Sequence, residues 1–287
     1  MRRCAIFLVL VATSCAGNPL DGTGIDCDPM AYQFDNEVWA LVFEDRVRLS
    51  ESGMVGVNPS VSPDGNRVAF TTGERETSLD LYVIDTDGTN LRLVWNGELI
   101  QSSIDWSPDG STLVFDQYSE RNGVIDNPLQ IFTISSDGSR GPVQLTDGAP
   151  NGKPKWGSDG RILFLSLRDG EMQEIYSMNP DGSDQVNLTN HSSRDVLAEL
   201  SPDGSSIVFA SDRAGNGDLD IWIMDADGSS VRQLTDGVER DTNPTWTSNG
   251  EQIIYRSEES PAGLWRMDSD GSDQTPLLRD AWLASCP

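Results

Sequence analysis

The chain has 287 residues, 37% of them hydrophobic, with 8 Trp and 8 Phe. This composition excludes a membrane-embedded bundle and a disordered chain, and the length suffices for one large domain with a substantial core. Its 20 Lys and Arg against 46 Asp and Glu give a formal charge of -26. Such a charge repels nucleic acid and excludes a general phosphate-binding surface. The single histidine, His191, excludes a metal site with several histidine ligands.

The first residues are typical of a bacterial secretory signal. Arg2 and Arg3 precede the apolar run 4–12, which is shorter than the about 20 residues that span a bilayer. The run ends in Ala-Thr-Ser-Cys at 12–15, which resembles a lipobox. We therefore predict a signal peptide at 1–14, lipidation of Cys15 and anchoring at the periplasmic or outer-membrane face of a bacterial envelope. Ordinary cleavage nearby, which would leave a soluble secreted protein, is the alternative.

Small, polar and turn-forming residues follow the predicted cleavage site, so residues 15–28 are predicted to be a lipidated, flexible tether. Cys4 would leave with the signal and Cys15 would carry the lipid. Cys27 and Cys286 would then remain, one at each end of the folded part, in a compartment that permits disulfides. The sequence predicts a bond between them.

Two turn motifs recur about every 45 residues through the rest of the chain, the predicted domain 29–287. The first is Ser-Pro-Asp-Gly or a variant of it, at 62–65, 107–110, 157–160, 201–204 and 247–250. The second ends in Asp-Gly and stands at 85–88, 135–138, 179–182, 225–228 and 268–271. Asp-Gly and Asn-Gly between apolar runs are strong hairpin signals, because the turn needs residues that tolerate positive φ.

Short apolar runs rich in β-formers separate these turns, as at 207–210, 221–224 and 231–235, and an inner strand precedes each first turn. Four short strands per repeat, with no convincing amphipathic helix, predict an all-β, six-bladed β-propeller of four-stranded antiparallel blades. The last blade would take three strands from residues 31–49. Its inner strand could come only from residues 280–287, so both chain termini would close it. Only nine residues follow Leu278, which leaves open whether that blade has three strands or four.

Several of these runs resemble the TolB-like propeller repeat, a resemblance that covers roughly residues 30–280. They are Ser-Asp-Arg at 211–213, the run 220–228 and Gln-Leu-Thr-Asp-Gly at 233–237. The resemblance implies a propeller whose mouth binds peptide segments of envelope proteins. In TolB itself the propeller follows a separate α/β domain, and about a dozen tether residues stand in its place here. The resemblance therefore supports the fold more than it supports the cellular role of TolB.

No catalytic, metal or cofactor site emerges from the sequence. An EF-hand loop needs Glu at its twelfth position, whereas counting from Asp85 and Asp225 gives Asn96 and Asp236, so we interpret the Asp-x-Asp-Gly runs as hairpin turns. Loose binding of calcium or sodium among surface carboxylates is the alternative. No Gly-x-Ser-x-Gly nucleophile motif is present, and His191 is interpreted as an exposed loop histidine. Acids are too numerous to single out a glycosidase pair. The acidic residues are spread over all repeats. This favours a role in solvation in salty surroundings over a role in attracting cationic partners or metal ions.

Propeller topology places both turn motifs on one face, here named the turn face. The second-to-third-strand loops and the crossings between blades lie on the other, the loop face, where irregular loops on a rigid scaffold favour binding. The candidate partner-binding residues on the loop face are Arg75, Arg121, Arg168, Arg213, Arg194, Asp195, Arg240 and Asp241. Arginine can hold a peptide carboxylate through two hydrogen bonds. The structural alternative, in which each Arg pairs with an Asp of the neighbouring blade, is favoured for Arg213.

The sequence therefore predicts a non-catalytic, monomeric propeller, anchored by its lipid alone, that binds a protein or peptide of the cell envelope. The alternative is a carbohydrate-active or lyase-type enzyme that uses carboxylates and Arg in the central funnel. The two hypotheses differ in geometry. An enzyme should show two or three carboxylates converging within about 5–10 Å beside an aromatic ring, whereas a scaffold should show self-paired Arg and Asp.

Overall fold

The computed structural model describes residues 9–11, 30–34, 37–42, 45–49, 56–72, 80–96, 100–121, 124–215, 217–237, 239–259, 262–279 and 284–285. All regular secondary structure within these ranges is β-strand, so the all-β prediction is confirmed for the described part. No helix there is long and apolar enough to cross a membrane.

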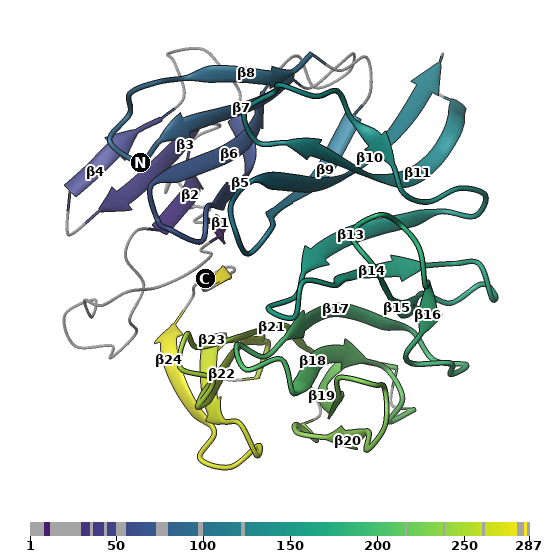
Figure 1. Ribbon diagram of the computed structural model, residues 1–287. Helices are drawn as coiled ribbons and strands as arrows, with labels where there is room; N and C mark the ends of the chain where they lie inside the picture. The colour runs from purple at the N-terminus through teal and green to yellow at the C-terminus, as the bar shows by residue number, and fades with distance from the viewer. Residues whose placement is uncertain are drawn as a thin grey trace.

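Five antiparallel sheets have four strands each (Figure 1). The first contains β5 (Gly56–Val61), β6 (Arg67–Thr72), β7 (Asp80–Asp85) and β8 (Arg92–Trp95). The second contains β9 (Ile100–Trp106), β10 (Thr112–Arg121), β11 (Val124–Ser135) and β12 (Val143–Gln144). The third contains β13 (Asn151–Trp156), β14 (Ile162–Ser166), β15 (Glu174–Met178) and β16 (Val186–Asn187). The fourth contains β17 (Asp195–Leu200), β18 (Ser206–Ser211), β19 (Asp220–Asp225) and β20 (Arg232–Gln233). The fifth contains β21 (Asp241–Trp246), β22 (Gln252–Ser257), β23 (Gly263–Asp268) and β24 (Thr275–Arg279).

The two repeated motifs form the hairpin turns that the sequence predicts. In the first sheet, Gly65 N donates to Ser62 O at 2.8 Å and Gly88 N donates to Asp85 O at 2.9 Å. Gly65 and Gly88 have φ of 72° and 84°, a conformation that glycine adopts without steric cost. The Asp87 carboxylate accepts hydrogen bonds from the backbone N–H and the hydroxyl of Thr89, so it is used within its own turn.

The core between the sheets repeats with the sequence. The second strand of each four-stranded sheet carries an aromatic residue at the same position, and each of these is at most 2% exposed: Phe70, Phe115, Phe164, Phe209 and Tyr255. Burying such a side chain contributes about 1.5–3 kcal/mol. First strands of successive sheets lie next to one another, as β9 does to β13 and β17 to β21, so they face the middle of the arrangement in Figure 1.

The sixth sheet has five strands in the order β25-β1-β2-β3-β4. Its later strands, β2 (Met30–Phe34), β3 (Glu37–Val42) and β4 (Asp45–Arg48), occupy the places expected from the sequence. Its inner strand differs from the expectation. β1 (Val9–Val11) pairs antiparallel with β2, and β25 (Ala284–Ser285) pairs in parallel with β1.

The difference at the inner strand has a physical reason. β1 comes from a continuous apolar run of strong β-formers, whereas β25 has only two residues. β1 also lies inside the predicted signal peptide 1–14, so loss of that peptide would remove it from the sheet. Cys27 and Cys286 lie outside the described residues, and their bond remains a prediction.

Candidate functional site

The loop-face residues singled out from the sequence fall into two groups. Six of them lie at the loop face: Arg194 and Arg240 in crossings, Asp195 and Asp241 at the start of inner strands, and Arg168 and Arg213 shortly after a second strand. Cys15 and Arg75, by contrast, lie outside the described residues, and Arg121 is described only as the last residue of β10.

Three crossings between sheets are fixed by a threonine at an equivalent position. The backbone N–H of Ile131, Ile175 and Ile221 donates to the hydroxyl of Thr146, Thr189 and Thr235 at 2.9, 3.0 and 2.9 Å. The next inner strand then begins with a polar residue that pairs with a serine at the end of the second strand. These pairs are Asn151 with Ser166, Asp195 with Ser211, and Asp241 with Ser257.

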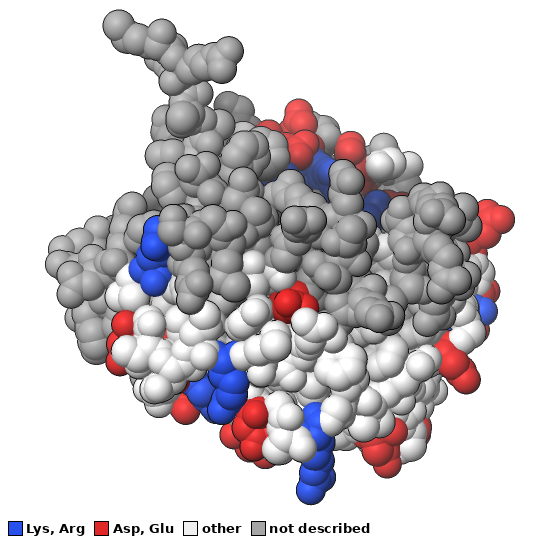
Figure 2. Space-filling view, turned by 90° about the horizontal axis from the view of Figure 1, so that it is seen from above, with Lys and Arg blue, Asp and Glu red and all other residues white. Residues whose placement is uncertain are grey.

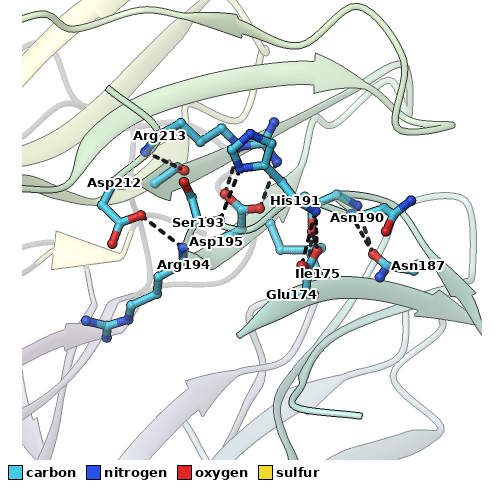
Figure 3. A network of polar contacts seen from close by, with 12 residues as sticks. Glu174, Ile175, Asn187, Asn190, His191, Ser193, Arg194, Asp195, Asp212 and Arg213 are labelled. Atoms are coloured by element: carbon cyan, nitrogen blue, oxygen red, sulfur yellow. Dashed lines mark hydrogen bonds and ion pairs between the residues drawn. The ribbon is translucent and has the colours of Figure 1, made fainter. Parts of the chain in front are cut away.

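Arg213 forms a buried ion pair with Asp195 (Figure 3). Its Nε lies 3.0 Å from Oδ1 and its Nη2 lies 2.7 Å from Oδ2, and the two side chains are 10% and 0% exposed. The guanidinium also lies over the Phe209 ring, 5.4 Å from its centroid. This Arg links the end of a second strand to the start of its inner strand, which is a structural role.

Arg168 takes the equivalent place one sheet earlier. Its Nη2 donates to Asn151 Oδ1 at 2.8 Å and its Nε to Ser166 Oγ at 2.9 Å. The guanidinium lies 4.8 Å from the centroid of the Tyr176 ring. An asparagine therefore replaces the aspartate here, and the arginine keeps its position.

Arg194 and Arg240 are exposed, as Arg168 also is, but neither guanidinium bonds the start of an inner strand among the described residues. Arg194 is held through its backbone N–H, which donates to Asp212 Oδ1 at 2.9 Å, while its Nε donates to Gln173 at 3.2 Å (Figure 3). The Arg240 carbonyl accepts from the Glu258 N–H at 3.0 Å. The guanidinium groups of these two residues are accordingly accessible from outside.

His191 is exposed in the crossing that follows β16, as the sequence predicts. Its backbone N–H donates to Glu174, and its Nδ1 accepts from the Ser193 N–H at 3.1 Å (Figure 3). The imidazole nitrogen thus has a backbone partner instead of a serine hydroxyl, which gives no support to a catalytic triad.

Sequence reasoning missed a charged group on the inner strands, formed by Asp105 of β9, Lys155 of β13 and Glu199 of β17. Lys155 Nζ lies 3.8 Å from Asp105 Oδ1, and the attraction of Asp105 raises the pKa of Lys155. Asp105 and Glu199 also accept the backbone N–H of Trp156 and Trp246, at 2.8 and 3.0 Å. Each of the three residues immediately precedes the Trp or Leu that ends its inner strand. This shared position in the repeat is the sequence signal that could have revealed the group.

A second group missed from the sequence surrounds Asp241. Buried Asp220, at the start of β19, and exposed Glu259, after β22, join Asp241 at the loop face. Burial, followed by the neighbouring carboxylates, Asp241 first, raises the pKa of Asp220 to about 6. The signal in the sequence is Ser-Glu-Glu at 257–259, where the third and fourth sheets have Ser-x-Arg.

Acidic side chains are scattered over the described part of the face that Figure 2 shows, which agrees with their spread through the repeats. No three His, Cys, Asp or Glu residues of the described ranges are grouped closely enough to hold a metal ion.

Comparison with known proteins gives a consistent picture. A model of the TolB beta propeller domain matches residues 37–163. A TolB homolog of Chlorobium luteolum is 28% identical over 153 residues, which cover 53% of this chain and 33% of that protein. Over residues 37–163 the chain thus resembles the TolB propeller domain. An uncharacterized protein of Agrobacterium fabrum is 30% identical over 160 residues, covering 53% and 49%. The chain spans half or less of the length of these curated relatives.

Solved structures show a similar fold over more of the chain. TolB from Acinetobacter baumannii has a TM-score of 0.63 at 21% identity, covering 85% of this chain and 58% of that one. A puromycin-hydrolyzing peptidase of Mycobacterium tuberculosis has a TM-score of 0.70 at 16% identity, covering 88% and 44%. An oligogalacturonate lyase complexed with manganese reaches 0.67 at 14%, covering 95% and 78%. The shared architecture thus occurs in proteins of different activities.

Proposed function

We propose that this TolB-like protein is a non-catalytic, six-bladed propeller that binds a protein or peptide partner of the cell envelope through its loop face. Residues 1–14 would direct export, lipidated Cys15 and the tether 15–28 would anchor it outside the cytoplasm, and 29–287 would form the propeller. The observation that carries the proposal is the division of the loop-face arginines. The guanidinium groups of Arg168 and Arg213 bond the first residue of their own inner strand, whereas those of exposed Arg194 and Arg240 bond no inner strand in the described part of the chain.

This division favours a binding role because exposed arginines on a rigid scaffold can pair with a partner's carboxylates without prior reorganisation. Each exposed arginine follows a crossing whose threonine is hydrogen-bonded to the preceding sheet. A partner would therefore meet donors whose backbone positions are already fixed.

The competing hypothesis of a carbohydrate-active or lyase-type enzyme needs free carboxylates near the middle of the molecule. Asp105 and Glu199 do lie there, but Lys155 stands between them and both accept backbone N–H groups. Carboxylates engaged in this way connect inner strands and are poorly placed to act on a substrate. The geometry of the described inner strands thus supports the binding proposal.

The loop-face proposal is tested by partner capture from a bacterial envelope extract. The combined variant Arg194→Ala, Arg240→Ala should lose most captured protein, because two exposed charge-assisted donors are removed while the contacts of Arg168 and Arg213 stay intact. Arg140→Ala is the matched control, since Arg140 is exposed in a hairpin on the turn face. Equal capture by wild type, control and combined variant would contradict the proposal.

Anchoring is tested separately by fractionation. Cys15→Ser should move the protein from the membrane fraction to the soluble envelope fraction, because one thiol is the proposed attachment point. Unchanged membrane association of this variant, with normal export, would disprove the lipid anchor.

A further inference from the structure

The Asp241 cluster, defined as Asp220, Asp241 and Glu259, breaks the pattern of the equivalent positions in neighbouring sheets. It lies where β19, the crossing to β21 and the end of β22 meet at the loop face. The equivalent positions one sheet earlier are Glu174, Asp195 and Arg213, and two sheets earlier they are Gln130, Asn151 and Arg168. Both earlier sets contain an arginine, whereas the Asp241 cluster contains three acids.

The backbone is the same in these places. The Arg213 N–H donates to Ser211 Oγ at 3.2 Å, the Arg168 N–H to Ser166 Oγ at 3.2 Å, and the Glu259 N–H to Ser257 Oγ at 3.1 Å. Glu259 therefore stands where the third and fourth sheets have an arginine, and only the side chain differs. The substitution reverses the charge that would face Asp241.

One buried oxygen of the cluster lacks a partner as a result. Thr189 donates its hydroxyl to Glu174 Oε2 at 2.8 Å, and Thr146 donates to Gln130 Oε1 at 2.8 Å. The Thr235 hydroxyl instead hydrogen-bonds to Asp241. Asp220 is 0% exposed, and its Oδ1 has no hydrogen-bond partner among the described residues.

The charges around the cluster do not compensate it. The negative charges of half-buried Asp218 and exposed Asp236 raise the pKa of Asp220 further. The negative charge of exposed Glu259 does the same to the pKa of Asp241. The cations of the adjoining segments are Arg240, which is exposed, and Arg256, whose Nη1 lies 3.1 Å from Glu258 Oε1. No ion pair between Asp241 and an arginine is found in the described part of the chain. Buried carboxylates without a paired cation are costly, so a cation that reaches them is bound favourably.

We propose that the Asp241 cluster binds a guanidinium group, supplied by an arginine side chain of a partner peptide. The neighbouring sheet shows the fit, because there a guanidinium bonds both oxygens of Asp195 and lies over Phe209. The fifth sheet keeps the corresponding acceptor, Asp241, and the corresponding ring, Tyr255. A planar guanidinium can satisfy Asp241 and Asp220 together, since it has five donors in a fixed fork.

A metal ion fits this place less well. The described carboxylates are not grouped closely enough to coordinate one ion. A guanidinium is larger and bridges acceptors that are farther apart. The inference deepens the proposed function and rests on it, because it names the side chain that a loop-face partner would insert.

The test uses small probes with the full chain. N-acetyl-arginine amide at millimolar concentration should raise the thermal unfolding midpoint of wild type, and calorimetry should show one site. N-acetyl-lysine amide and calcium chloride should bind at least about tenfold more weakly. Glu259→Arg supplies the missing guanidinium within the chain. It should fold, since arginine occupies this position in two other sheets, and should raise the midpoint while abolishing the response to the probe.

Two controls separate site from charge. Glu171→Arg makes the same charge change at an exposed residue of the loop after β14 and should leave probe binding unchanged. Asp241→Asn should weaken binding about tenfold or more. A response to calcium that exceeds the response to the arginine probe, or Glu259→Arg binding the probe like wild type, would overturn the proposal. Absent probe binding with partner capture still dependent on Arg194 and Arg240 would refute this inference alone.

Discussion

Replacing Arg213 by methionine should destabilise the protein strongly, because it strands a buried carboxylate. Asp195 is 0% exposed and both of its oxygens bond to Arg213, at 3.0 and 2.7 Å. Removing one partner of a buried pair costs about 3–5 kcal/mol, since the other charge stays desolvated. For a domain of this size each 1 kcal/mol lowers the unfolding midpoint by about 2–4 °C, so the loss should be about 6–20 °C.

Urea unfolding followed by tryptophan fluorescence measures this loss, with two comparison variants. Asp195→Asn should cost less than Arg213→Met, because asparagine can still accept one hydrogen bond from Arg213, as Asn151 does from Arg168 in the neighbouring sheet. Asp184→Asn breaks the Arg161–Asp184 pair, whose side chains are 29% and 61% exposed, and should cost less than about 1 kcal/mol. A loss for Arg213→Met no larger than that for Asp184→Asn would refute the reasoning.

Three further predictions concern other parts of the molecule. Gly228→Ala should lower the unfolding midpoint more than Gly160→Ala, because both have positive φ but only at Gly228 would the new Cβ lie 2.5 Å from a backbone oxygen. The folded-state pKa of Asp220, about 6, lies above its unfolded value of about 4. The folded protein thus binds more protons between these values, and stability should fall as pH rises from about 4 to 6. Asp220→Asn should flatten that part of the profile in a pH series of urea titrations. Finally, Cys27→Ser should lower the midpoint as much as dithiothreitol lowers that of wild type, if Cys27 and Cys286 are bonded, and thiol titration should find no free thiol in the oxidised mature chain.

The strands and turns could be predicted from the sequence because their determinants are local and repeated. Asp-Gly turns, β-branched runs and a repeat of about 45 residues agree with one another in five units, so an error in one unit would have been visible in the others. The inner strand of the sixth sheet was not predicted correctly in detail. It depends on which distant segment, β1 or β25, pairs beside β2, and no local signal ranks two such candidates.

The roles of the charged residues likewise depend on contacts between segments that are far apart in the sequence. The sequence placed Arg168, Arg194, Arg213 and Arg240 on one face, since propeller topology follows from the repeats. It could not separate the buried pair of Arg213 from the exposed side chain of Arg194, because burial depends on how the second strand and the crossing pack.

The sequence by itself determined the all-β repeat, the hairpin turns and the face on which the irregular loops lie. The tertiary structure decided which charges meet. Lys155 stands between carboxylates of two other sheets, and Glu259 faces Asp241 where a neighbouring sheet has an ion pair. The physical reason is range: turn and strand preferences act over a few residues, whereas pairing and desolvation of charges act through space between segments far apart in the chain.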